Sequence, residues 1–283
     1  MENRVSLVNL GSEYLAAGAI NNSLRESEIF LSHILNCPRV ELYLDNFEVQ
    51  QDEALDYWQL LNERVKGLPL QYLLGISEFM GLKFKLKPGV FIPRPETEIL
   101  VETVLNLLPA TCHLPLKILD LGIGCGNIAI SIARHLEKAH IFACDISDSA
   151  LQLAQENSRL NEVRIYLVKS DLFGAFKNKA CFSLIVSNPP YVDTDQIPQL
   201  SRELHYEPKE ALDGGRDGLF YYRKIIAEAA NYLQSGGALA LEIGDNQGQR
   251  IREIFSQSGR FALTGVIKDY HAIERVMVAE KIR

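Results

Sequence analysis

The strongest constraint on this chain is an alternation of short apolar runs with amphipathic stretches between residues 116 and 242. Apolar runs of about four to eight residues bounded by Gly, Pro or Asp are typical of buried strands, and the stretches between them repeat at helical spacing. Alternating strands and helices predict a doubly wound α/β sheet, in which ligands bind beyond the carboxyl ends of the strands. We expect strands at 117–121, 140–144, 163–168, 182–186 and 238–242, and helices at 127–136, 148–160 and 220–233.

Residues 1–75 instead repeat apolar side chains at helical spacing, with Asn22 or Ser23 as an N-cap, and predict a small helical bundle. The period changes at residues 76–91, where apolar residues around Gly81 predict a β-hairpin. We therefore predict a helical domain at 1–75, a β-hairpin linker at 76–91 and a catalytic domain at 92–283. From composition alone the helical domain is either a packing appendage or a module that recognises a partner.

The end of the chain predicts a helix at 247–256 and two segments, 261–267 and 276–280, that can pair. The connection 192–216 is long and has little periodicity. Connections of this length in compact domains usually carry function or are mobile.

The composition, 47% hydrophobic and 23% charged over 283 residues, is that of a soluble globular protein. No apolar run is long enough to cross a bilayer, and the start has no pattern of a secretory signal. The five cysteines are scattered and the six histidines show no ligand spacing, so we expect neither disulfides nor a metal site. These features predict a cytoplasmic protein without a membrane partner.

The net charge is −7, and residues 1–75, with eleven acidic and five basic side chains, supply −6 of it. Stable binding to nucleic acid requires a large basic surface, which this balance disfavours. A local phosphate contact or a basic protein partner remains compatible with it.

A glycine-rich loop, Asp120-Leu121-Gly122-Ile123-Gly124-Cys125-Gly126-Asn127, joins the first strand to the first helix. Alternate glycines let a ligand lie against bare backbone. The dinucleotide fingerprint started at Gly122 requires a sixth-position glycine where this chain has Asn127, so a dehydrogenase is disfavoured. The spacing is similar to that of S-adenosylmethionine-dependent methyltransferases, in which the loop passes under the methionyl part of the cofactor. The residues expected to line the cofactor here are Gly122, Ile123, Gly124, Cys125 and Gly126.

Two further strand ends carry acidic residues. Asp145 ends the second strand, where a carboxylate accepts hydrogen bonds from both ribose hydroxyls. Asp171 and Leu172 follow the third strand, where Asp171 can accept from the adenine amino group and Leu172 can pack on the ring.

The fourth strand is followed by Asn188-Pro189-Pro190-Tyr191. Two prolines cannot continue a sheet, so Asn188 is held on a stiff turn with its amide directed away from the strand. An amide, a proline carbonyl and an aromatic face form a pocket for a small planar group that carries N–H. We predict Asn188, Pro189 and Tyr191 as catalytic, the same residues with Pro190 as substrate-binding, and Asn188 as also contacting the cofactor.

These motifs together resemble the PrmC/HemK family of protein-(glutamine-N5) methyltransferases that modify peptide chain release factors. The resemblance covers nearly the whole catalytic half. It is carried by Gln71-Tyr72-Leu73-Leu74-Gly75, Glu78-Phe79-x-Gly81-Leu82, Phe91-Ile92-Pro93-Arg94-Pro95-Glu96-Thr97-Glu98, the glycine loop, Asn188-Pro189-Pro190-Tyr191, and Tyr206-Glu207-Pro208-x-x-Ala211-Leu212. Members often have Trp where this chain has Leu172, so weaker stacking on adenine is expected.

The resemblance implies a Rossmann-like class I methyltransferase fold, S-adenosylmethionine as cofactor, and as substrate the glutamine of the Gly-Gly-Gln motif of class 1 release factors. It carries the cofactor role to Gly122, Gly124, Gly126 and Asp145, and the glutamine-binding role to residues 188–191. The enzyme is expected to be a monomer.

Two other readings stay open. An adenine-N6 methyltransferase acting on nucleic acid suits Asn188-Pro189-Pro190-Tyr191 equally, because a flipped adenine also presents an amino group on a planar system. A methyltransferase-like scaffold that binds protein or RNA without catalysis would retain the fold but has no need of the glycine loop, Asp145 and Asn188.

Overall fold

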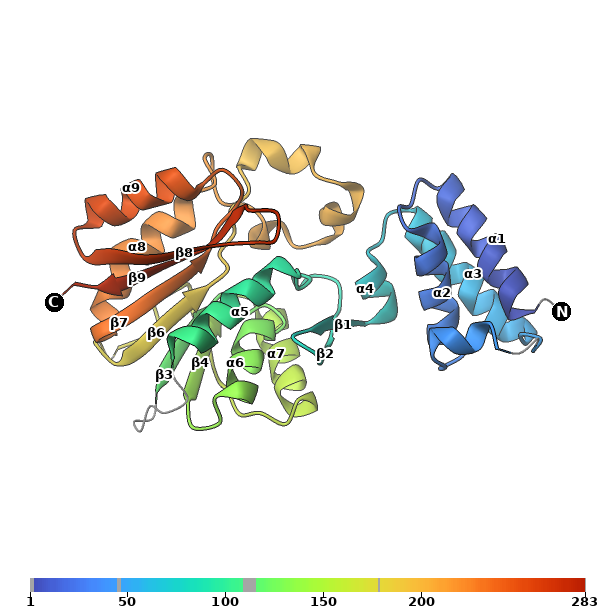
Figure 1. The fold of residues 1–283 in the computed structure, drawn as a ribbon, viewed down its shortest axis with the longest axis horizontal. Helices are drawn as coiled ribbons and strands as arrows, with labels where there is room; N and C mark the ends of the chain where they lie inside the picture. Colours follow the sequence, from blue (N-terminus) through green and yellow to red (C-terminus); the bar gives the residue numbers. More distant parts are fainter. Residues whose placement is uncertain (1–2, 45–46, 109–115, 178, 283) are drawn as a thin grey trace. The chain divides into compact units, whose positions relative to one another are not determined.

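The computed structural model describes residues 3–44, 47–108, 116–177 and 179–282. Their contacts divide the chain into two compact units (Figure 1). The first consists of Met1–Ile76 and Ser201–Tyr206, and the second of Ser77–Leu200 and Glu207–Arg283. The backbone therefore passes between the units at three places.

The first unit is helical, as predicted. Its elements are α1 (Arg4–Ala17), α2 (Ser23–Ile34), the 3-10 helix η1 (Arg39–Leu42), α3 (Gln51–Val65) and α4 (Leu70–Leu74). Asn22 occupies the N-cap position of α2, but its backbone is left-handed (φ 58°) and its side chain makes no capping bond. The expected cap is thus correct in position and wrong in chemistry.

The core of this unit surrounds the buried Tyr57, whose hydroxyl lies 2.6 Å from Ser27 Oγ and 3.2 Å from the Leu7 carbonyl oxygen. Gly11 is required beside it, because a Cβ there would lie 1.8 Å from the Tyr57 hydroxyl. The remaining core side chains are aliphatic or aromatic: Leu7, Val8, Leu15, Phe30, Leu31, Leu42, Val49 and Leu61.

The short segment Ser201–Tyr206 packs with this helical unit, although it lies in the long connection that follows β6. Arg64, almost fully buried, bonds Glu26 at 2.6 Å and Glu203 at 2.7 Å. Arg202 donates to the Val65 carbonyl at 3.2 Å. The Tyr206 hydroxyl donates to the next carbonyl, that of Lys66, at 3.2 Å.

The expected hairpin consists of β1 (Ile76–Phe79) and β2 (Leu82–Lys85), and all of it except Ile76 belongs to the second unit. A seven-stranded sheet follows, in the order β5-β4-β3-β6-β7-β9-β8. The strands from β3 to β7 are parallel and β9 is antiparallel to both β7 and β8. Their bounds are β3 Lys117–Leu121, β4 His140–Asp145, β5 Tyr166–Lys169, β6 Phe182–Ser187, β7 Leu233–Glu242, β8 Phe261–Lys268 and β9 Glu274–Lys281. The doubly wound sheet and the pairing of the last two segments are confirmed, and the structure adds that this pair is antiparallel.

Helices cover both faces of this sheet (Figure 1). α5 (Glu96–Leu107), α6 (Asn127–His135) and α7 (Asp148–Leu160) lie on one face, and α8 (Phe220–Tyr232) and α9 (Gly248–Ser258) on the other. The chain runs from β3 outward to β4 and β5, and later from β6 outward to β7. The strand order therefore reverses between β3 and β6, and ligand sites form at such a reversal.

The connection 192–216 contains three 3-10 helices, η2 (Thr194–Gln199), η3 (Arg202–Tyr206) and η4 (Lys209–Ala211). Its ends are joined, because Val192 N donates to the Leu212 carbonyl at 2.9 Å and Gly214 N to the Val192 carbonyl at 2.8 Å.

No helix in the described ranges is long and apolar enough to span a bilayer. Among the same residues Cys37, Cys125, Cys144 and Cys181 form no disulfide, and Cys112 lies outside them.

Candidate active site

The register of the central strands aligns the positions singled out from the sequence. Leu121 of β3 pairs with Cys144 of β4 on one side and with Ser187 of β6 on the other. Gly122, Asp145 and Asn188 each follow directly after these paired residues. Ser187 Oγ also donates to the Leu121 carbonyl at 2.7 Å, which fixes the exits of β3 and β6 beside each other.

The glycine loop exposes backbone at its first two glycines. Gly122, Gly124 and Gly126 all have positive φ, at 80°, 56° and 94°. A Cβ on Gly122 or Gly124 would meet no atom within 4 Å, whereas one on Gly126 would lie 2.7 Å from Ile130 Cδ1. The first two glycines thus border open space, and the third permits close helix packing.

The intervening Ile123 and Cys125 side chains are buried, with 2% and 1% of their surface exposed. A ligand in the space above the loop would therefore meet their main chain and not their side chains. Burial also raises the pKa of the Cys125 thiol to about 12, so this sulfur is not a nucleophile.

Asp145 lies beside this loop. Its Oδ2 accepts from Gly124 N at 3.0 Å and its Oδ1 from Ser147 N at 2.9 Å. Burial raises its pKa, and the bonds from Ser147 and Gly124 oppose that rise. Each carboxylate oxygen can accept more than one bond, so the Asp145 carboxylate retains capacity for hydroxyl donors.

The neighbouring Asp120 is fully buried beneath the loop. Neither of its oxygens has a hydrogen-bond partner among the described side chains and backbone. Burial raises its pKa well above the ordinary value, which favours a neutral carboxyl in the core.

Asp171 lies at the surface of the structure. Its side chain is exposed and lies 3.8 Å from Lys224 Nζ. Leu172 is half-buried against the sheet core and has a left-handed backbone (φ 45°). A contact between either residue and adenine stays a prediction.

Asn188 is half-buried and its Nδ2 donates to Thr97 Oγ1 at 3.1 Å. Pro189 is buried and Pro190 partly exposed. The Tyr191 ring packs on the sheet core, and burial raises its pKa to about 12, so the phenol is neutral.

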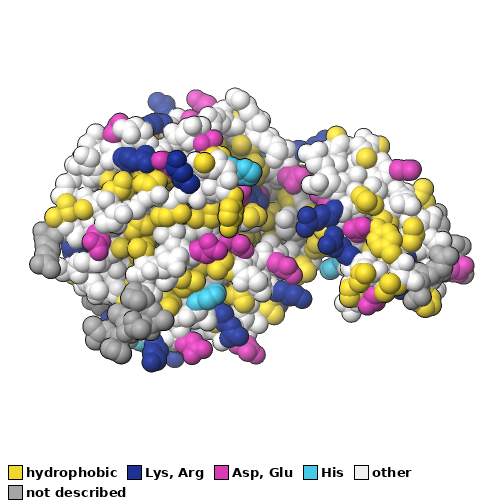
Figure 2. Space-filling view, in the orientation of Figure 1, with side chains coloured by type: hydrophobic (Ala, Val, Ile, Leu, Met, Phe, Trp, Pro, Cys, Tyr) yellow, Lys and Arg dark blue, Asp and Glu magenta, His cyan; other side chains and the backbone are white. Residues whose placement is uncertain are grey.

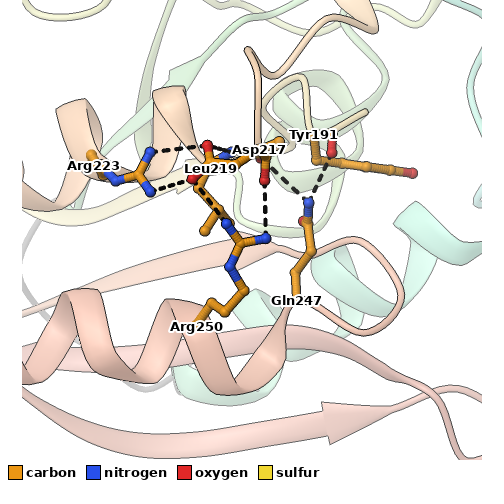
Figure 3. A network of polar contacts seen from close by, with 7 residues as sticks. Tyr191, Asp217, Leu219, Arg223, Gln247 and Arg250 are labelled. Atoms are coloured by element: carbon orange, nitrogen blue, oxygen red, sulfur yellow. Dashed lines mark hydrogen bonds and ion pairs between the residues drawn. The ribbon is translucent and has the colours of Figure 1, made fainter. Parts of the chain in front are cut away.

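Gln247, at the start of α9, holds the Tyr191 backbone (Figure 3). Its Nε2 donates to the Tyr191 carbonyl at 2.8 Å, and its Oε1 accepts from Gly244 N at 3.2 Å. Asp217 binds both Arg223 and Arg250 close by, which ties α8 and α9 to the same loop. The sequence reading did not single out Gln247, because a glutamine at a helix start gives no distinct signal.

Glu207 joins two of the motifs quoted from the sequence. Its carboxylate, 1% exposed, accepts from Ile92 N at 3.0 Å and pairs with Arg94. The Arg94 guanidinium also lies 4.9 Å from the centre of the Phe91 ring. The proline-rich loop and the second half of the connection 192–216 are thus joined through one carboxyl group.

Asn157 of α7 holds the glycine loop from the other side. Its Nδ2 donates to the Cys125 carbonyl at 2.8 Å and to the Lys85 carbonyl at 3.1 Å, and its Oδ1 accepts from Lys85 N at 2.7 Å. The hairpin and the loop are therefore connected through one buried amide, which the sequence did not indicate.

The sequence analysis also did not predict Glu242, the last residue of β7, as a site residue. It is fully buried near Thr97 and Asn188, and its Oε2 has no hydrogen-bond partner among the described residues. Burial raises its pKa from the ordinary 4.5 to about 7, while hydrogen bonding from Thr97 and Asn188 and the charge of Arg275 lower it. The one sequence feature from which Glu242 could have been predicted is its position as a carboxylate at the end of an otherwise apolar strand.

Two family models match the chain. Residues 6–75 match the model described as PrmC N-terminal domain, and residues 81–218 match the model described as Methyltransferase small domain.

Curated relatives match over nearly the full length. The chain is 42% identical over 262 residues to a release factor glutamine methyltransferase of Thermodesulfovibrio yellowstonii, covering 92% of this chain and 93% of that protein. It is 40% identical to the protein of that name from Moorella thermoacetica, with 94% of each chain covered. Among solved structures, a methyltransferase from Pyrococcus furiosus superposes with a TM-score of 0.54 at 19% identity, covering 71% of this chain and 90% of that one. This last likeness supports the fold alone.

Proposed function

Because this chain belongs to the family of release factor glutamine methyltransferases, we propose that it methylates the glutamine of the Gly-Gly-Gln motif of class 1 peptide chain release factors. The side-chain amide nitrogen, N5, gains the methyl group of S-adenosylmethionine and loses one proton to water, and S-adenosylhomocysteine is released. The observation that carries the proposal is the setting of Asn188, which directly follows β6 and whose Nδ2 donates to Thr97 Oγ1 at 3.1 Å.

The residues at the strand ends fit S-adenosylmethionine. Gly122 and Gly124 border space into which no side chain intrudes, which suits the methionyl part. Asp145 has acceptor capacity for the two ribose hydroxyls. The cofactor supplies an electrophilic methyl group on a sulfonium sulfur.

The chain's own residues position the acceptor nitrogen. An amide nitrogen is a weak nucleophile because its lone pair is delocalised into the carbonyl. Asn188 Oδ1 and the Pro189 carbonyl can each accept one N–H of the substrate amide, which directs the lone pair and favours negative charge on nitrogen. Positioning of this kind can contribute roughly 7–11 kcal/mol to lowering a barrier.

The rival reading, an adenine-N6 methyltransferase, is not favoured. The relatives that cover this chain carry the name release factor glutamine methyltransferase. On the face drawn in Figure 2, basic and acidic side chains are interspersed, and the total charge is −7. A nucleic-acid enzyme would be expected to concentrate basic residues around its site.

The domain roles form part of the same proposal. Residues 1–75 recognise the release factor, 76–91 link the domains and 92–283 catalyse transfer. The enzyme acts as a cytoplasmic monomer without stable nucleic-acid binding. The acidic charge of 1–75 supports attraction of a basic region of the partner.

The direct test is to incubate the protein with labelled S-adenosylmethionine and a purified release factor. Label should appear on the factor and disappear when the Gly-Gly-Gln glutamine is changed to glutamate. Label that persists on that variant, or that appears instead on adenine in added RNA or DNA, would reject the proposal.

Asn188→Ala tests the site itself. Turnover should fall by about a hundredfold or more, because the acceptor for the substrate N–H is lost, while cofactor affinity measured by calorimetry survives. Turnover within a few-fold of wild type would reject the role of Asn188.

A further inference from the structure

Two buried side chains from distant parts of the chain, those of Thr97 and Glu242, lie next to Asn188. Thr97 lies in the first turn of α5 and is 1% exposed, Glu242 ends β7 and is 2% exposed, and Asn188 follows β6. Asn188 Nδ2 donates to Thr97 Oγ1 at 3.1 Å, which makes the threonine oxygen the acceptor. The hydroxyl proton is therefore available for another acceptor.

The Glu242 carboxylate is the candidate acceptor, because Leu241 pairs with Ser187 between β7 and β6, and Glu242 and Asn188 directly follow these two paired residues. Hydrogen bonding from the Thr97 and Asn188 side chains acts on its carboxylate, and an ionised carboxylate can only accept. With Glu242 ionised, the donors can all run in one direction: the Asn188 amide donates to Thr97, and both the Thr97 hydroxyl and the Asn188 amide can donate to Glu242. If the carboxylate were absent or neutral, the Thr97 hydroxyl could turn and donate to Asn188 Oδ1.

An asparagine amide has nearly the same shape in its two orientations, so packing alone does not select one. The orientation matters here because one edge of the amide carries the acceptor Oδ1 and the other carries the donor group Nδ2. When Nδ2 is directed to Thr97, Oδ1 remains free to accept the substrate N–H. If the amide were reversed, the Nδ2 hydrogens of Asn188 would face the N–H groups of the substrate, and donor would meet donor.

We propose that Glu242 and Thr97 are positioning residues that fix the orientation of the Asn188 amide, so that Oδ1 faces the substrate. The proposal rests on the proposed function for the identity of the substrate, but the orientation is a property of the free enzyme. Neither residue touches the substrate in this scheme.

The surroundings of Glu242 make the orientation sensitive to pH. The charged and titratable groups that act on it are Arg275 of β9, Glu96 of α5, Tyr191, and Tyr222 of α8. The two tyrosines stay neutral at physiological pH because burial raises the pKa of each. Burial sets the pKa of Glu242 at about 7, so the acceptor form predominates above that pH.

The first test compares Thr97→Val, which removes the hydroxyl, with Thr97→Ser, which keeps it. Thr97→Val should lower kcat about tenfold, the loss expected when a buried hydrogen bond is left unmade. Thr97→Ser should restore kcat to within about threefold of wild type. KM and cofactor affinity should change little in both variants. Equal kcat in the two variants would overturn the proposal.

The second test uses Glu242→Gln, which keeps the size but can also donate. Its kcat should fall about tenfold, and the rise of kcat with pH through about 7 in the wild type should be lost. A wild-type pH profile retained in this variant would contradict the proposal.

The third measurement does not depend on turnover. In the ¹H–¹⁵N spectrum of the free enzyme, the Asn188 side-chain amide protons should show slow exchange that is lost in Glu242→Gln and in Thr97→Val but kept in Thr97→Ser. An unchanged Asn188 signal in the first two variants would reject the orientation mechanism. A wild type that shows this pattern but does not methylate release factors would reject the proposed function instead.

Discussion

The Ile92 amide donates to Glu207 Oε2 at 3.0 Å across 115 residues of sequence. The same carboxylate, 1% exposed, pairs with Arg94, which is only 28% exposed. The loop that contains Ile92 and Arg94 and the connection that contains Glu207 are thereby joined by one buried carboxyl group. Both motifs are visible in the sequence, but nothing in the sequence indicates that they bind each other.

This arrangement predicts a large loss of stability in Glu207→Ala. The change leaves the Ile92 N–H and the Arg94 guanidinium without their acceptor, and breaking a partly buried pair of this kind costs about 3 kcal/mol. Glu207→Gln keeps an acceptor for Ile92 and should cost roughly half as much. Urea unfolding of the three proteins measures the difference, and equal midpoints for the two variants would contradict it.

The glycine loop predicts a specific loss of cofactor binding in Gly124→Ala. Both Gly124 (φ 56°) and Gly259 (φ 60°) are left-handed and border open space. Alanine should therefore cost each site a similar strain of about 1 kcal/mol.

Gly259→Ala at the end of α9 is the matched control. Calorimetry should show weaker S-adenosylmethionine binding by about tenfold in Gly124→Ala, because its methyl group occupies the space over the loop, and unchanged binding in Gly259→Ala. Equal affinities would place the cofactor elsewhere.

Gln247→Leu should impair both stability and turnover. The leucine can neither donate to the Tyr191 carbonyl nor accept from Gly244 N, so two buried backbone groups lose partners at a cost of about 2–4 kcal/mol. With the Tyr191 backbone released, kcat should also fall. Gln249→Leu on the same helix changes an exposed glutamine and should leave both quantities near wild type.

Glu242 predicts a pH-dependent stability difference. Between its ordinary pKa of 4.5 and its folded pKa of about 7, the folded state keeps a proton that the unfolded state releases. Stability from this group is therefore fully present below about pH 4.5 and is lost as pH rises through about 7, by roughly 3 kcal/mol.

Glu242→Gln does not titrate at this position and serves as the reference. Unfolding free energies of both proteins, measured from about pH 5 to about pH 8, should show the wild type losing stability relative to the variant. A constant difference across this range would contradict the burial argument.

The charge of the helical domain predicts an effect on substrate affinity. Neutralising the exposed Glu13 and Asp56 to Gln and Asn should raise KM for the release factor about threefold at low salt, with less effect as salt screens the attraction. The cofactor KM should not change. Neutralising Glu137 and Glu228, exposed on the second unit, is the control and should leave both KM values unaltered.

The order and type of the elements in the sheet could be predicted because each depends on local signals. Apolar runs, helical spacing and turn residues placed every strand from β3 to β9. Two boundaries were wrong: β5, expected at 163–168, begins at Tyr166, and β7, expected at 238–242, begins at Leu233. The glycine loop followed from spacing alone. The register of β3 with β4 and β6 then places Gly122, the first glycine of the loop, in line with Asp145 and Asn188.

The supporting residues could not be predicted in the same way. Thr97 and Asn188 are 91 residues apart, and Asn157 and Cys125 are 32 apart. Contacts of this kind depend on the three-dimensional path of the chain and leave no periodic pattern. Leu172 illustrates a further limit, since a left-handed leucine runs against local preference and is imposed by its surroundings.

The membership of Ser201–Tyr206 in the helical unit changes how truncated proteins should be interpreted. A fragment beginning at residue 77 would still contain Arg202, Glu203 and Tyr206 but would lack Arg64, Val65 and Lys66, to which they bond. Poor activity of such a fragment could result from disorder of the loop that contains Ser201–Tyr206 as well as from the missing helices. Point substitutions on the helical surface therefore separate substrate recognition from loop integrity, which removal of the whole domain does not.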